Sequence, residues 1–183
     1  KAAKRIEVNR IKMNDGDFRY TNALTQRETH VHHIDFLFQN ILIDSSTQVD
    51  STRFLFAQYA TISFQNFSMI TTDSMYRISL KQCNINPAIN EMNIKGFEVK
   101  PLLSKVAFGK KLGYRKDRFD ARVDSIFFKE TDWWAFATDE KIGSQKIMLH
   151  GGEFHVFSNK ALPARKSTKN KKIPHQSLMA LAI

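Results

Sequence analysis

The chain repeats a short apolar pattern in which the alternation slips by one residue. In "FLFQNILI", apolar side chains alternate up to Phe38 and resume only at Ile41. The same arrangement, apolar-x-apolar-x-x-apolar-x-apolar, occurs at residues 6–13, 36–43, 62–69, 78–85, 92–99 and 121–128. On a helix these positions would scatter around the axis. On a strand a one-residue slip is what a β-bulge or a sharp bend produces, so the pattern predicts a repetitive, bent β-structure with one apolar face.

Three polar steps interrupt this alternation: "NDGD", "KETD" and "HGGE", each followed by an aromatic residue. Asp-Gly and Gly-Gly supply the positive φ that a tight turn or a glycine bulge needs. We therefore expect a strand, a turn or bulge, and another strand that begins at Phe18, Trp133 or Phe154. Trp133 and Trp134 would then lie on opposite faces of a strand.

The predicted fold is mainly β: a repetitive, bent antiparallel sheet, as an elongated groove or an open sandwich, with one or two short helices. Residues 1–158 are expected to form this domain, with a short helical insertion at 101–113 after Pro101. Residues 159–183 read as a basic loop and a short apolar terminal segment. Because the chain starts inside a periodic segment with no signal peptide, we expect a piece of a longer chain.

The net charge of +10 over 183 residues favours anionic partners. A basic cluster surrounds Tyr114 and is expected to contact anionic lipid headgroups at a membrane surface. Its members are Lys110, Lys111, Arg115, Lys116 and Arg118. A basic nucleic-acid-binding domain is a further reading. No helix-turn-helix, RNA-recognition or cold-shock pattern accompanies the cluster, so nucleic acid is not the partner we expect.

The sequence carries no recognisable catalytic signature, since G-x-S-x-G, P-loop and G-x-G-x-x-G motifs are absent from it. His30 and His32 share a strand face and are the only candidate metal ligands. Zinc needs a third and usually a fourth ligand, and no recognisable spacing supplies them. We therefore expect no cofactor, no metal and no enzymatic activity.

The apolar face is the strongest functional signal. Such a face must be buried against another layer or filled by a ligand, and few segments remain to form a covering helical layer. Either the sheet closes on itself, as a self-contained β-sandwich for protein interaction or adhesion, or an apolar ligand completes it. The expected groove lining is Phe36, Phe38, Ile62, Phe64, Ile78, Leu80, Ile94 and Phe97.

Units of the form I-x-[apolar]-x-[DG]-G-[DE]-F, together with "KKLGYRKDRFDARVDSIFF" and "GGEFHVFSNKALP", resemble the AsmA-like, TamB-related family of Gram-negative envelope proteins. The resemblance covers essentially the whole chain. It implies an elongated, curled sheet with an apolar concave face, lying in the periplasm and anchored by an inner-membrane helix that this sequence lacks. The implied function is non-enzymatic: holding or conducting lipid acyl chains, or scaffolding outer-membrane assembly with other envelope proteins.

Overall fold

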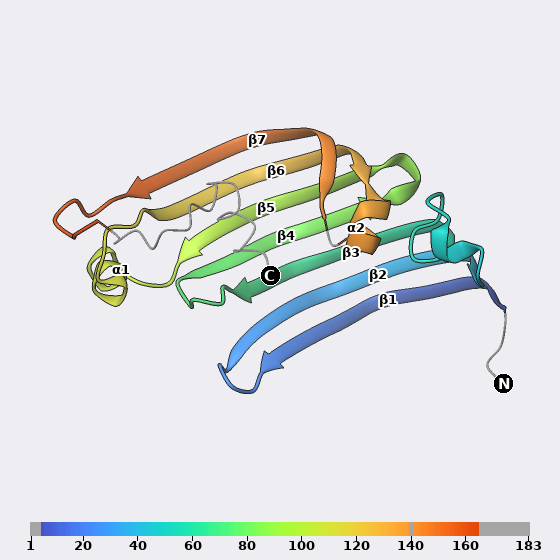
Figure 1. Ribbon diagram of the computed structural model, residues 1–183, viewed down its shortest axis with the longest axis horizontal. Coiled ribbons are helices and arrows are strands. Elements are labelled where there is room, and N and C mark those ends of the chain that lie inside the picture. The colour runs from blue at the N-terminus through green and yellow to red at the C-terminus, as the bar shows by residue number, and fades with distance from the viewer. Residues whose placement is uncertain (1–4, 140, 165–183) are drawn as a thin grey trace.

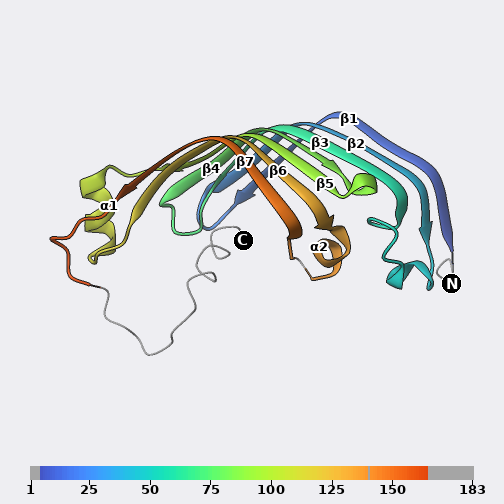
Figure 2. The ribbon, with the colours of Figure 1, turned by 90° about the horizontal axis from the view of Figure 1, so that it is seen from above.

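In the computed structural model, which describes residues 5–139 and 141–164, seven antiparallel strands form one sheet in chain order. The strands are β1 (Ile6–Asn22), β2 (Arg27–Ile43), β3 (Ala57–Ile70), β4 (Tyr76–Asn86), β5 (Glu91–Pro101), β6 (Arg118–Asp132) and β7 (Gly143–Phe157). The sheet is a single arched layer that stays open between β1 and β7 (Figures 1 and 2). The prediction of a mainly β, bent antiparallel sheet is confirmed. The described residues form no second sheet, so they do not make a closed sandwich.

Within the described residues, four short helical segments join the strands: η1 (Thr47–Val49), η2 (Pro87–Ile89), α1 (Lys105–Leu112) and α2 (Trp133–Asp139). A helix was expected within 101–113, and α1 lies there. The Ser104 hydroxyl accepts a hydrogen bond from the Ala107 N–H, and Gly113 ends the helix at φ 70°. In Figure 2, α2 and the β2–β3 connection lie on the concave side of the arch, at one end of the strands. Helix α1 lies at the opposite end of the strands.

The strands bend where the apolar alternation slips. Asn66 in β3, Gly96 in β5 and Gly151 in β7 have φ of 51°, 63° and 61°. The strand registers place them on one line across the sheet, with Lys81 of β4 and Asp124 of β6 between them. Because neighbouring strands change phase at the same line, the apolar side chains stay on one face on both sides of the bend.

Two of the predicted turns or bulges lie inside continuous strands, and the one at Asp15 is a bulge, whereas β6 and β7 pair across Gly151 without a register shift. Asp15, with φ 54°, lies within β1 next to a register shift, and Gly151 lies within β7. The third expectation was wrong, because Trp133 begins α2 and Trp133 and Trp134 are not on a strand. The reason is local: the Asp132 carboxylate accepts a hydrogen bond from the Ala135 N–H at 2.9 Å, which starts a helix.

Two apolar clusters lie at opposite ends of the strands. At the α2 end, Phe54, Ala60 and Trp133 form a buried cluster. The side chains that pack against this cluster are Phe38, Ile62, Ile85 and Met92. Phe108 of α1 is buried with Met75 and Tyr76 at the other end, against Val99, Leu103 and Leu112. Within the described residues, helical segments therefore cover the two ends of the concave face and leave its middle uncovered by a second layer. The predicted terminal segment lies almost entirely in 165–183, outside the described residues.

Candidate functional site

Apolar side chains line the concave face in rows that cross the sheet. One row spans all seven strands: Met13, Phe36, Ile62, Ile85, Met92, Phe128 and Ile147. The flanking rows are Ile11, Phe38 and Ala60 on one side, and Phe64, Cys83, Ile94, Ile126 and Leu149 on the other. Beyond the bend the rows continue as Phe67, Leu80, Phe97 and Val123, then Met69, Ile78, Val99, Ala121 and Phe154. These side chains are called the apolar groove below.

The structure brings the eight predicted lining residues together on this face. Each belongs to one of the rows above, and ring contacts agree with that assignment. The rings of Phe36 and Phe38 lie 5.3 Å apart, and those of Phe64 and Phe67, on either side of the slip, lie 6.4 Å apart. Sequence reasoning had not placed Phe128 in the lining, although it follows the same slipped pattern. Contact of these residues with lipid stays a prediction.

Each strand bends along its own length, so the groove runs across the strands, parallel to the rows (Figure 2). Neighbouring strands lie about 4.8 Å apart, so seven strands give a groove roughly 29 Å long. The hydrocarbon core of a bilayer, two acyl layers thick, measures about 30 Å. The groove is therefore long enough for a complete acyl chain.

The convex face is mostly polar. A row on that side also crosses all seven strands: Arg19, His30, Ser68, Ser79, Glu98, Arg122 and Glu153. The contrast between the two faces makes the sheet amphipathic, with water on one side and an apolar surface on the other.

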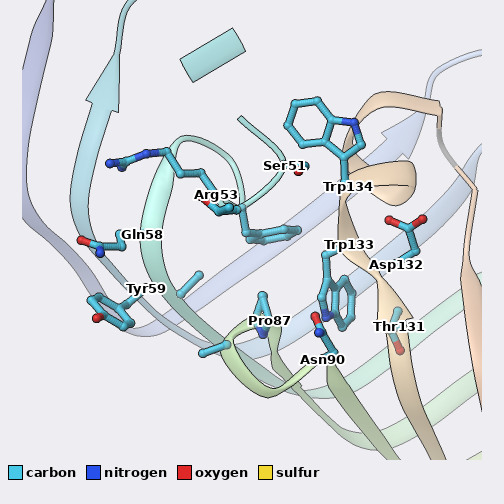
Figure 3. Close-up of a pocket in the computed structure, with 14 residues that line it drawn as sticks. Ser51, Arg53, Gln58, Tyr59, Pro87, Asn90, Thr131, Asp132, Trp133 and Trp134 are labelled. Atoms are coloured by element: carbon cyan, nitrogen blue, oxygen red, sulfur yellow. The ribbon is translucent and has the colours of Figure 1, made fainter. Parts of the chain in front are cut away.

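A pocket of about 630 Å³ lies at the α2 end, between the β2–β3 connection, η2 and α2 (Figure 3). It is called the α2 pocket below. Its lining is Ser51, Thr52, Arg53, Phe54, Gln58, Tyr59, Ala60, Pro87, Ala88, Asn90, Thr131, Asp132, Trp133 and Trp134. Sequence reasoning missed this site. The adjacent tryptophans were the only signal, and they were assigned to a strand.

Two buried polar atoms of this lining have no hydrogen-bond partner within the described chain: Thr131 Oγ1 and Trp133 Nε1. Their residues are only 3% and 8% exposed. The main chain around them is satisfied, because the Thr131 N–H donates to the Asn90 carbonyl at 3.0 Å. Buried polar atoms without partners are rare in folded proteins. The pocket lining therefore has hydrogen-bonding capacity that the described chain leaves unused.

The charges beside the pocket are compensated. Arg53 Nε lies 3.1 Å from Asp50 Oδ2, and Arg53 Nη1 donates to the Asn40 carbonyl at 2.8 Å. The Thr52 hydroxyl and N–H, followed by Arg53, hold the pKa of Asp50 below its ordinary value, so the pair stays ionised. Asp132 caps α2.

The basic cluster lies at the α1 end, away from the α2 pocket (Figure 2). Lys110 and Lys111 are in the last turn of α1, and Arg115 and Lys116 follow it as exposed residues. Lys111 Nζ donates to the Asp73 carbonyl at 2.9 Å. Arg118 begins β6, and its Nε donates to the Leu103 carbonyl at 3.2 Å. All five cations thus gather around one end of the strands. Their contact with anionic headgroups stays a prediction.

The histidines pair with carboxylates. His30 Nε2 lies 2.8 Å from Glu28, and His32 Nδ1 lies 2.9 Å from Asp17. The hydrogen bond from His32 holds the pKa of Asp17 below its ordinary value. Across residues 5–139 and 141–164, no group of three or more His, Cys, Asp or Glu side chains forms a candidate metal site.

Comparison with protein-family models, with curated proteins and with solved structures gives no match. No helix in the described part of the chain has the length and apolar character that crossing a membrane requires.

Proposed function

We propose that the protein is a non-enzymatic module that holds or conducts lipid acyl chains, which lie in the apolar groove. The observation that carries the proposal is the set of apolar rows that cross the concave face of a single-layer sheet. Ile62, Ile85 and Met92 pack against the cluster at the α2 end, whereas the neighbouring row from Phe64 to Leu149 belongs to neither helical cluster. Each methylene buried there would contribute about 0.8 kcal/mol, so a long apolar chain binds without a specific polar contact. The groove also reaches both sheet edges, where Met13 and Ile147 are 40% and 55% exposed.

The proposal takes up the resemblance to AsmA-like and TamB-related envelope proteins, and with that family it places the protein in the periplasm at the inner membrane. The basic cluster at the α1 end supports a role for the membrane surface, because each cation near anionic headgroups contributes about 1 kcal/mol of attraction. In this arrangement the α1 end contacts the anionic headgroups of the membrane surface, while the concave face receives the acyl chains of a bound lipid.

Native mass spectrometry of the purified chain, followed by solvent extraction and lipid analysis, tests the proposal. We expect co-purified lipid at a defined stoichiometry, or lipid acquired on incubation with vesicles of phosphatidylethanolamine and phosphatidylglycerol. A protein mass that stays free of lipid after this incubation would contradict the proposal.

A second proposal, a scaffold that pairs with other envelope proteins, is supported by the sheet edges. β1 and β7 have 17 and 15 residues, and the described chain pairs each on one side only. Long open edges accept an added strand. Size-exclusion chromatography with light scattering tests whether the open edges accept a strand from another copy of the chain. We expect a concentration-dependent assembly, which Leu149→Pro in the edge strand β7 should weaken.

A further inference from the structure

The α2 pocket differs in chemistry from the apolar groove that it adjoins. The groove is lined by hydrocarbon, whereas the pocket combines aromatic walls with buried hydrogen-bonding atoms. Figure 3 shows Arg53 and Tyr59 on one side of the pocket, with Trp133 and Trp134 on the other. The pocket therefore suits a ligand that is both apolar and oxygen-bearing.

The unpartnered atoms define what the ligand must offer. An indole Nε1–H only donates a hydrogen bond, whereas a threonine hydroxyl both donates and accepts. Trp133 Nε1 and Thr131 Oγ1 are both buried, and both lack a partner in the described chain. A buried donor that stays unpaired is costly, so an acceptor oxygen from a ligand would be favoured beside Trp133.

The charges define what the ligand must lack. Arg53 is already paired with Asp50, and the other lining residue that is charged at neutral pH is Asp132. An anionic head would meet Asp132 without an unpaired cation to offset the repulsion. An uncharged head carrying carbonyl oxygens meets no such penalty.

The pocket is also continuous with the groove. Ala60 belongs to a groove row and to the pocket lining, and the cluster of Phe54, Ala60 and Trp133 packs against Phe38 and Ile62. A ligand whose head enters the pocket thus has its chains next to the groove.

We propose that the α2 pocket binds the uncharged glycerol-ester head of a lipid, with Trp133 Nε1–H donating to an ester carbonyl and the Thr131 hydroxyl bonding to a second oxygen. This inference rests on the proposed function, because the chains of the same lipid occupy the apolar groove. It adds polar selection of the lipid head beside a groove that otherwise recognises only hydrocarbon.

The test compares a short-chain diacylglycerol with the dialkylglycerol of the same chain length, which lacks both carbonyls. Calorimetry on the full chain should give the diester a three- to tenfold lower Kd, about one net hydrogen bond. Trp133→Phe and Thr131→Val should each reduce this preference, while Thr61→Val, an exposed threonine on the convex face, should leave it unchanged. Circular dichroism checks that each variant folds. Trp134→Phe leaves Trp133 as the single tryptophan, so its fluorescence reports the pocket directly.

The outcomes separate this inference from the proposed function. If neither lipid binds, the groove proposal fails and the pocket proposal fails with it. If both bind with equal affinity, and Trp133→Phe changes neither, the groove stands and the pocket proposal is overturned. Tighter binding of the matching phosphatidic acid, lost in Arg53→Gln, would show a charged-head site and would also overturn it.

Discussion

The indole of Trp133 meets the ring of Phe54 edge to face, with ring centroids 5.8 Å apart and ring planes at 76°. The contact joins α2 to the β2–β3 connection at one end of the strands, along one side of the groove. We expect Trp133→Ala or Phe54→Ala to lower the free energy of unfolding by about 3–5 kcal/mol, because each deletes a buried ring. The double variant should lose less than the sum, since the two rings share one contact. Urea unfolding of all four proteins measures this, and strict additivity would contradict it.

Gly151 lies opposite Asp124 on the bend line, and a side chain there would collide with the Asp124 carboxylate. Gly113, at the end of α1, has a similar positive φ of 70° but open space around it. Gly113→Ala should therefore cost about 1 kcal/mol of unfolding free energy, from backbone strain alone. Gly151→Ala should cost more unfolding free energy than Gly113→Ala, and adding Asp124→Ala should recover most but not all of the difference, because the Cβ of residue 124 stays close. Chemical denaturation measures the unfolding free energy of each variant. Equal losses in Gly113→Ala and Gly151→Ala would count against steric crowding at the bend.

Phe127 and Phe128 are neighbours in β6 that point to opposite faces. Phe128 pairs with Met92 and Ile147 in the apolar groove, whereas Phe127 pairs with Asn93 and Met148 on the convex side. A carboxylate at 128 would have to be desolvated beneath an acyl chain, so Phe128→Asp should reduce lipid loading at least tenfold. Phe127→Asp is the matched control and should load like wild type.

Native mass spectrometry after incubation with vesicles gives the loading of each folded variant. Phe64→Asp combined with Ile94→Asp, two of the predicted lining residues, should abolish loading. Wild-type loading in that folded double variant, or equal loss in Phe127→Asp and Phe128→Asp, would argue against the concave face as the lipid site.

His33 and Asp15 link β1 to β2 at the bulge, with His33 Nδ1 and Asp15 Oδ1 2.5 Å apart. This hydrogen bond and the Asp15 charge raise the pKa of His33 above its ordinary value of 6.5. Because the folded-state pKa of His33 is raised, its interaction with Asp15 stabilises the fold. This stabilisation is fully present below about pH 6.5 and is lost as the pH rises through the folded-state pKa.

The Tm of Asp15→Asn should therefore fall further below that of wild type at a pH below 6.5 than at a pH above the folded-state pKa of His33. NMR titration of the imidazole should show the His33 pKa falling towards its ordinary value in Asp15→Asn. An unchanged His33 pKa in that variant would refute this assignment.

Much of the fold could be predicted because the slipped alternation is a local signal. Phe64 and Phe67, or Ile94 and Phe97, can share a face only if the backbone between them departs from regular extended geometry, and Asn66 and Gly96 are residue types that tolerate the required positive φ. Trp133 was assigned wrongly to a strand because the alternation of polar and apolar residues also fits "DWWAF". The helix there begins with a hydrogen bond from the Ala135 N–H to the Asp132 carboxylate, which an alternation pattern does not reveal.

The sequence by itself determined the β class, the bends and the side chains that share the apolar face, since each follows from residues adjacent in one strand. Only the tertiary structure decided that the slips of β3 to β6 align into one bend line, whereas those of β1 and β2 face each other elsewhere, because both depend on the registers of neighbouring strands. The α2 pocket likewise required the β2–β3 connection, η2 and α2 to meet, and the burial of Trp133 Nε1 there results from packing between segments distant in the chain.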